Sequence, residues 1–217
     1  MALFLLALVV CVLVHLSAIA AAGAMLGVSV QQFSLGFGPT LFTRGRFRLG
    51  LIPSGGSVTF LDTTSTEVPD SEKHRALDQQ PLIKKLAICL SGCVALAGLS
   101  VTLGGSAAFD EMAATPYQFA SGALSPFDQA KSLISAASAF ISSAGFLALL
   151  SVVAAKNCAL NAMPLTALNG GDALAAIGRS TGLIRWWPRK ATLLLFFVLL
   201  SAFISWGIGI ASYAIAI

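Results

Sequence analysis

The chain has 217 residues, of which 57% are hydrophobic and only 10% are charged, and its net charge is +4. Soluble domains carry about a quarter of charged residues, so this composition excludes an ordinary water-soluble enzyme and predicts a multi-pass integral membrane protein. The positive charge requires no nucleic-acid partner, because contact with anionic lipid accounts for it. The length favours a single membrane domain over residues 1–217.

Four apolar stretches predict transmembrane helices, since a spanning helix needs about 20 residues. They lie at about 3–28, 86–108, 132–155 and 191–217. The first stretch ends in AIAAAGA, which resembles the end of a signal peptide. However, no Lys or Arg precedes Arg44 and the apolar run is longer than a usual signal sequence, so we expect a spanning helix.

The segment 29–60 alternates Phe, Leu and Val with Gly, Ser and Arg. Gly36, Pro39 and Gly45 interrupt it, which is typical of two or more short strands joined by turns. Non-helical backbone at membrane depth must be shielded by protein. We therefore expect a small sheet at the cytoplasmic boundary, tucked against the helices, followed by an exposed polar loop over 61–85.

The distribution of basic residues predicts the orientation. Lys and Arg concentrate after the first helix and between the third and fourth helices, whereas the expected outer loop over 109–131 holds only Lys131. The positive-inside rule then places the basic segments in the cytoplasm and both termini outside.

The third helix is expected to run into a broken extension over 156–178. Pro164 removes a helical hydrogen bond, and Gly170 permits close approach of backbone. Asn161 and Asn169 place amides where a bilayer excludes them. Such groups indicate either a functional site or a break satisfied by neighbouring helices, and the sequence leaves both interpretations open.

The four cysteines lie in or beside apolar helices, and none forms a CxxC pair. Neither a disulfide framework nor a zinc-ribbon spacing is indicated. We expect the thiols to pack as small apolar groups. They are Cys11, Cys89, Cys93 and Cys158.

Several segments together resemble one family. FSLGFG and IPSGGSV are similar to the F-S-x-G-F-G and I-P-x-G-G-x-V elements of a membrane-associated hairpin, and NAMPLTALNGG is similar to N-x-x-P-x-x-x-L-D-G-G. These patterns belong to the site-2 proteases, the intramembrane zinc metalloproteases of peptidase family M50. The segment QPLIKKLAICLSGCVAL is similar to the family's second helix, but Ser91-Gly92-Cys93 departs from A-G-P.

The resemblance implies an all-α membrane fold with four transmembrane helices, a hairpin or small sheet between the first two, and a broken third helix. The PDZ domain that usually lies between the second and third helices is not expected here. The family's bacterial members also have both termini outside, in agreement with the charge distribution.

The resemblance also locates the catalytic positions. In HExxH the two histidines bind zinc and the glutamate acts as the base, and an aspartate of L-D-G completes the ligands. Here the motif begins at His15, but Leu16 cannot accept a proton, Ile19 cannot bind a metal, and Asn169 is a poor zinc ligand. We therefore expect no catalytic residues, no metal and no cofactor.

An alternative zinc site uses Cys11, one helical turn before His15, together with Asp172. Zinc would be a cofactor only under this reading, and no base is evident. Otherwise Cys11 is a packing residue and His15 forms a hydrogen bond with Asn169 or Asp172, which lowers the cost of burying both groups.

The sequence thus predicts a non-catalytic binding or scaffold subunit, whose partners are the lipid bilayer and another transmembrane protein or larger membrane complex. Exposed strand edges can pair with an extended peptide without any metal. The alternatives are an active intramembrane metalloprotease with displaced ligands and a small transporter-like bundle. The expected partner-binding residues are Phe33, Gly36, Phe37, Ile52, Gly55, Gly56, Val58, Asn161 and Pro164.

Overall fold

The computed structural model describes residues 1–64, 67–181 and 189–215. The last two residues of the fourth predicted helix, 216–217, lie outside this part of the chain. The elements in chain order are α1 (Ala2–Met25), β1 (Val30–Arg44), β2 (Phe47–Phe60), the 3-10 helix η1 (Lys73–Arg75), α2 (Leu82–Gly104), α3 (Ala107–Leu124), α4 (Gln129–Ser143), α5 (Phe146–Ala162), α6 (Asn169–Ser180) and α7 (Arg189–Ile215).

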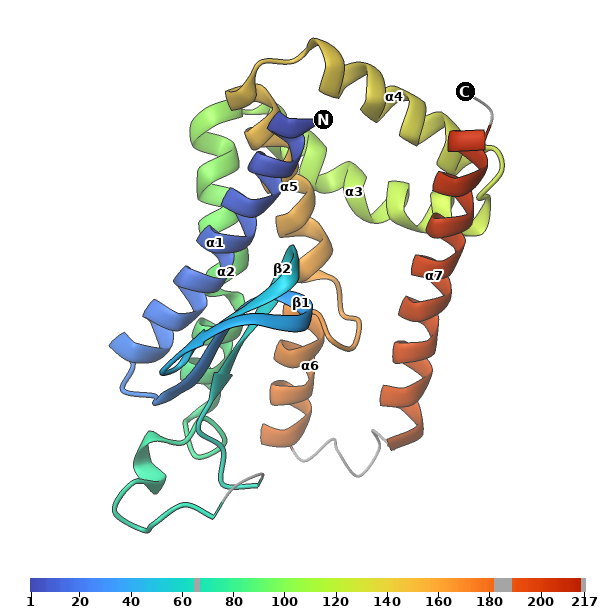
Figure 1. Cartoon of the computed structure of the whole chain (residues 1–217). Helices are drawn as coiled ribbons and strands as arrows, with labels where there is room; N and C mark the ends of the chain where they lie inside the picture. Colours follow the sequence, from blue (N-terminus) through green and yellow to red (C-terminus); the bar gives the residue numbers. More distant parts are fainter. Residues whose placement is uncertain (65–66, 182–188, 216–217) are drawn as a thin grey trace.

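The predicted fold class is confirmed, because the chain is mostly helical with one small sheet between its first two long helices. Within the described residues, three helices are long and apolar enough to span a membrane: α1, α2 and residues 192–215 of α7. Figure 1 shows α1, α2 and α5 packed together, with the sheet against α1 and with α7 standing at the far side of α3 and α4.

The predicted third spanning helix over 132–155 differs from the structure. It is divided into α4, which ends at Ser143, and α5, which begins at Phe146. Ala144 and Gly145 are extended, with ψ of 143° and 160°, so the helical ladder stops between the two. The predicted break further along is confirmed, since α5 ends before Pro164 and α6 begins at Asn169.

The segment expected as an outer loop, 109–131, is mostly helical. It forms α3, which packs along α5, and the start of α4. Lys156, expected at the start of a cytoplasmic segment, lies inside α5 and contacts Glu111 at 2.8 Å and the side-chain oxygen of Gln118 at 2.8 Å. A lysine within an apolar helix needs such partners, because an unpaired charge is costly there.

The hairpin folds back on itself, which hydropathy alone does not reveal. Gly36 and Gly38 both have φ of +84°, a conformation that glycine adopts without strain. The bend brings the tip to the base of β1, where the Phe33 N–H donates to the Arg46 carbonyl at 2.7 Å. One stretch of β1 therefore has two sets of partners: Phe33, Ser34 and Leu35 lie opposite Val58, Ser57 and Gly56 and also opposite Phe47, Arg48 and Leu49.

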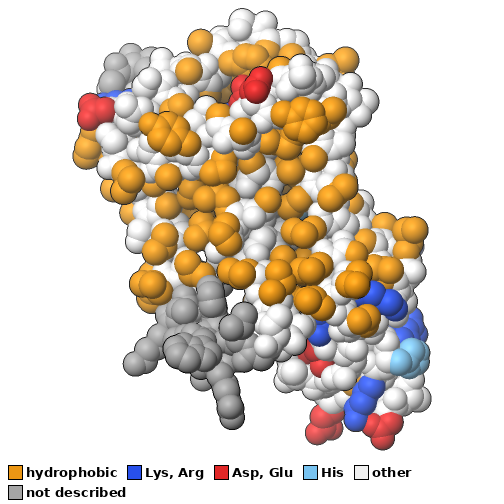
Figure 2. Space-filling model, turned by 180° about the vertical axis from the view of Figure 1, so that it is seen from behind, with side chains coloured by type: hydrophobic (Ala, Val, Ile, Leu, Met, Phe, Trp, Pro, Cys, Tyr) orange, Lys and Arg blue, Asp and Glu red, His pale blue; other side chains and the backbone are white. Residues whose placement is uncertain are grey.

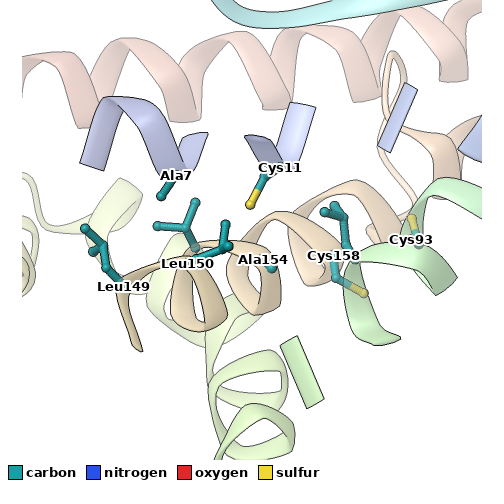
Figure 3. Packing of buried hydrophobic residues seen from close by; sticks show 9 residues of the cluster. Ala7, Cys11, Cys93, Leu149, Leu150, Ala154 and Cys158 are labelled. Carbon is teal, nitrogen blue, oxygen red and sulfur yellow. The ribbon is translucent and has the colours of Figure 1, made fainter. Parts of the chain in front are cut away.

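The main core lies where α1, α2 and α5 meet. Figure 3 shows Cys11 directed toward α5, and Cys93 and Cys158 packed among the same apolar side chains. The four thiols are free, and three of them are buried, as predicted. Ser100 and Ser151 each donate a hydroxyl hydrogen bond to the other's carbonyl, at 2.8 and 2.9 Å, which ties α2 to α5.

Candidate functional site

His15 lies on the buried face of α1 and is 9% exposed. Its Nε2 is 3.0 Å from Oδ1 of Asn169, and the Asn169 amide nitrogen donates to the Cys89 carbonyl at 2.8 Å. Because the amide nitrogen is used in this way, Oδ1 is left as an acceptor and Nε2 must carry the imidazole proton. The predicted contact between His15 and Asn169 is therefore present, and it joins α1, α2 and α6.

The other imidazole nitrogen meets the backbone of α2. A Cβ placed on Gly92 would lie 2.5 Å from Nδ1 of His15, so any larger residue there would push the helix away. Among the described residues Nδ1 has no hydrogen-bond partner, although it is buried. Gly92 and Cys89 are site residues that the sequence analysis did not assign. The departure at Ser91-Gly92-Cys93 was the available signal.

The two remaining positions of the degenerate motif are parts of the hydrophobic core. Leu16 is 3% exposed and packs with Val12 and Leu35, which attaches the sheet to α1. Ile19 is 8% exposed and packs with Val28 and Ile88. Both side chains fill space between elements, so neither position presents a polar group to a metal or to water.

The residues around His15 do not fit a zinc ion. A structural or catalytic zinc needs three or four His, Cys, Asp or Glu ligands. Within the described part of the chain no three such side chains come together in this way. The alternative set is thus not assembled: Cys11 is buried in the α1–α2–α5 core, and Asp172 is an exposed residue of α6.

The side-chain amide nitrogens near the end of α5 are satisfied within that helix. The amide nitrogens of Asn157 and Asn161 donate to carbonyls four residues earlier, at 3.1 and 2.9 Å. The two glycines that begin α6 are required by close packing, as predicted. A Cβ on Gly170 would lie 2.1 Å from the Ala162 carbonyl oxygen, and one on Gly171 would meet the Leu165 carbonyl at the same distance.

The expected partner-binding residues divide into internal and exposed groups. Gly36 is buried, and a Cβ on Gly56 would collide with the Ser34 carbonyl oxygen and Leu16. Phe33, Gly55, Val58 and Asn161 are half-buried. Pro164 is exposed, and the exposed large apolar residues of the sheet are Phe37, Leu41, Phe42, Phe47, Leu51 and Ile52.

A histidine on the first spanning helix, a curled glycine-rich hairpin beside it and a Pro-interrupted helix that returns to it together define a membrane domain of the intramembrane-protease class. The chain belongs to peptidase family M50, whose family profile matches residues 3–204.

Two relatives carry the family's activity in their names. One from Neisseria meningitidis, named "Putative zinc metalloprotease", is 40% identical over 83 residues, which is 36% of this chain and 19% of the relative. The "Regulator of sigma E protease" of Haemophilus influenzae is 31% identical over 97 residues, which is 42% of this chain and 22% of the relative. The matched stretches thus cover about a fifth of the length of these relatives.

Proposed function

We propose that this chain is a non-catalytic member of family M50 that binds a transmembrane segment of another membrane protein. The observation that carries the proposal is the hydrogen bond between His15 and Asn169. These two residues stand at positions where the family's motifs place zinc ligands, and here they are partners of each other. The neutral imidazole and the neutral amide form a hydrogen bond with each other, and this contact needs no metal ion.

The chemistry of the neighbouring positions supports the same proposal. A metalloprotease needs a carboxylate to accept a proton from the metal-bound water, and general acid–base catalysis contributes about 10²- to 10⁴-fold to a rate. Leu16 offers no such group, and Ile19 offers no second imidazole. Both are enclosed in apolar clusters that hold α1 against the sheet and against α2.

Binding would use the exposed apolar side of the sheet. Phe37 is 54% exposed and Ile52 is 53% exposed, and they lie opposite each other in the hairpin. An extended or partly unwound segment can add to such a sheet through main-chain hydrogen bonds, while pockets between side chains select the sequence. Pro164, exposed after α5, is the proposed contact from the broken helix.

The proposal is tested by measuring the zinc content of the full chain purified in mild detergent. We expect no stoichiometric zinc, and no cleavage of a single-span substrate. A matched variant, Leu16→Glu/Ile19→His/Asn169→Asp, recreates the family's ligands and base and should raise zinc binding if it folds. Stoichiometric zinc in the parent protein that is lost in His15→Ala would contradict the proposal and favour an active protease.

Partner binding is tested separately by placing a photo-crosslinking residue in the intact protein in its native membrane. Substitution at Phe37 or Ile52 should give a defined adduct with one membrane protein. Ile83, which is 79% exposed on α2, provides the control position. Equal adducts from Ile83 and from the sheet would indicate random collisions and would contradict a binding surface on the hairpin.

We also propose that both ends of the chain face the outside of a bacterial inner membrane. The start of α1 and the end of α7 lie at one end of the molecule, and the loop after β2 lies at the opposite end, in support of this orientation (Figure 1). Labelling of single introduced cysteines in intact cells, one near Ala2 and one near Glu72, is the test. If an impermeant reagent labelled only the cysteine near Glu72, the orientation would be the opposite of the one proposed.

A further inference from the structure

A pocket of about 230 Å³ lies where α1 ends and the chain turns into β1. Residues of the turn line it, together with two arginines from distant parts of the sequence. Neither His15 nor the exposed side of the sheet belongs to it. The lining residues are Ala24, Gly27, Val28, Ser29, Val30, Arg46 and Arg75.

Backbone hydrogen bonds hold the two arginines at the pocket. The Ser29 N–H donates to the Arg75 carbonyl at 3.0 Å, which fixes η1 beside the turn. The Phe33 N–H donates to the Arg46 carbonyl at 2.7 Å, which returns the hairpin tip to the base of β1. Arg46 and Arg75 are therefore brought to the same pocket as Ser29 by the way the hairpin curls and by the docking of the polar loop.

The pocket offers donors that the described protein does not use. Among the described residues, no acceptor pairs with the guanidinium group of Arg46 or Arg75, or with the hydroxyl of Ser29. Two carboxylates of the polar loop have other partners: Asp70 pairs with Lys73, and Asp78 accepts hydrogen bonds from Thr63 and Gln79. A pocket lined by two arginines and a serine suits a tetrahedral oxyanion, since arginine binds phosphate through paired N–H groups.

We propose that this pocket binds a phosphate group, supplied by the headgroup of an anionic membrane lipid. The depth of the site supports a lipid source, because Ala24 lies in the last turn of the first candidate span and Ser29 lies just beyond it. Figure 2 shows most of the Lys and Arg side chains of the face it draws at one end of the molecule, interspersed with Asp and Glu and below a broad hydrophobic surface. Anionic lipids are attracted to basic residues at such a boundary.

The test is a titration of the full-length protein in neutral detergent with two probes, a short-chain phosphatidylglycerol and inorganic phosphate. Arg46→Gln/Arg75→Gln should weaken binding of the phosphate-bearing probe by at least about tenfold, the loss expected from two charge-assisted hydrogen bonds. Arg44→Gln/Lys131→Gln removes the same charge outside the lining without breaking either ion pair of the described residues, and it should retain the parent affinity.

The two probes distinguish the sources of the phosphate group. Saturable binding of phosphatidylglycerol with little response to inorganic phosphate assigns the site to a lipid headgroup, whereas equal affinities assign it to the free anion. The proposal would be overturned if the lining and control variants lost equal binding affinity, or if neither probe bound saturably. Ser29→Ala keeps both charges and should weaken binding by less than the double arginine variant. It provides a second test of the site if the double variant does not fold.

Discussion

Two of the most apolar helices, α1 and α7, have very different surroundings. Both are long enough and apolar enough to span a membrane. However, 33% of the most apolar 18-residue stretch of α1 is buried inside the protein, compared with 11% of that of α7. Packing partners of α1 include α2, α5 and both strands. The principal contacts of α7 are with α3 and α4, through bonds such as that from the Trp206 indole N–H to the Phe119 carbonyl at 3.0 Å.

Hydropathy therefore identifies which helices can span a membrane, but it does not identify the elements that pack against them. Leu16 and Leu194 have the same side chain, but Leu16 is 3% exposed while Leu194 is 64% exposed. The first contributes to the fold through packing, and the second faces lipid or a partner. Substitutions in α1 should therefore change the stability of the protein more than substitutions in α7.

The largest effect is expected for Leu16→Ala. It removes buried methyl groups between α1 and the sheet and should lower the free energy of unfolding by about 2–5 kcal/mol. Leu194→Ala on the exposed face of α7 is the matched control and should change it by less than about 0.5 kcal/mol. Unfolding by steric trapping in bicelles measures both. Similar losses for the two variants would contradict the assignment of α1 to the core.

Asn169→Ala should have the next largest effect. It leaves the buried Nε2 of His15 and the Cys89 carbonyl without their partner, which costs about 1–3 kcal/mol. Asn161→Ala is the control, because that amide bonds to its own helix and ties no second element to α5. The same unfolding measurement applies. If Asn161→Ala cost as much as Asn169→Ala, the polar tie between α1 and α6 would not be a stabilising contact.

Gly122→Leu tests how α7 is held. A Cβ at this position of α3 would lie 2.2 Å from the Trp206 ring, so the two helices must separate, at about 1–3 kcal/mol. We expect less disulfide formation between cysteines introduced at Ala123 and Ser205, which span the contact. Gly98→Leu, on open space along α2, should leave the yield unchanged. An unchanged yield in Gly122→Leu would show that α7 does not depend on this contact.

The smallest effect concerns Asp78 in the polar loop. Burial opposes its ionisation, but hydrogen bonds from Thr63 and Gln79 outweigh burial and lower the pKa of this carboxyl below its ordinary 3.8. The stabilisation is therefore complete above about pH 4 and is lost as the pH falls through the lowered pKa. Asp78→Asn should abolish this acid-side slope in unfolding measurements. A slope that persists in the variant would assign it to other carboxyls.

A contact of His15 with Asn169 or Asp172 could be predicted because the resemblance to the family's two motifs implies that these segments meet, and the structure shows Asn169 as the partner. A histidine on the first helix and an asparagine at the start of α6 occupy places that converge throughout such a fold, and burial then requires them to share a hydrogen bond. The close packing at Gly170 followed from the same motif. The sequence indicated only that Leu16 cannot accept a proton and that Ile19 cannot bind a metal; their packing against the sheet and against α2 was not predicted.

The break between α4 and α5 could not be predicted from hydropathy. Ala144 and Gly145 lie within a run of small and apolar residues that contains no proline, so composition continues smoothly across the break. Whether such residues stay helical depends on the helices packed against them. The packing of α3 along α5 was missed for a related reason, since it depends on tertiary contacts such as those of Lys156 with Glu111 and Gln118.

That pairing has a consequence for how the chain enters the membrane. A lone lysine in the middle of an apolar helix disfavours transfer from the insertion machinery into lipid by about 2.5–3.5 kcal/mol. Glu111 and Gln118 precede Lys156 in the sequence, so they are synthesised first and are available when α5 emerges. The contacts with Glu111 and Gln118 offset this cost, so we expect insertion of α5 to be favoured by α3 lying beside it.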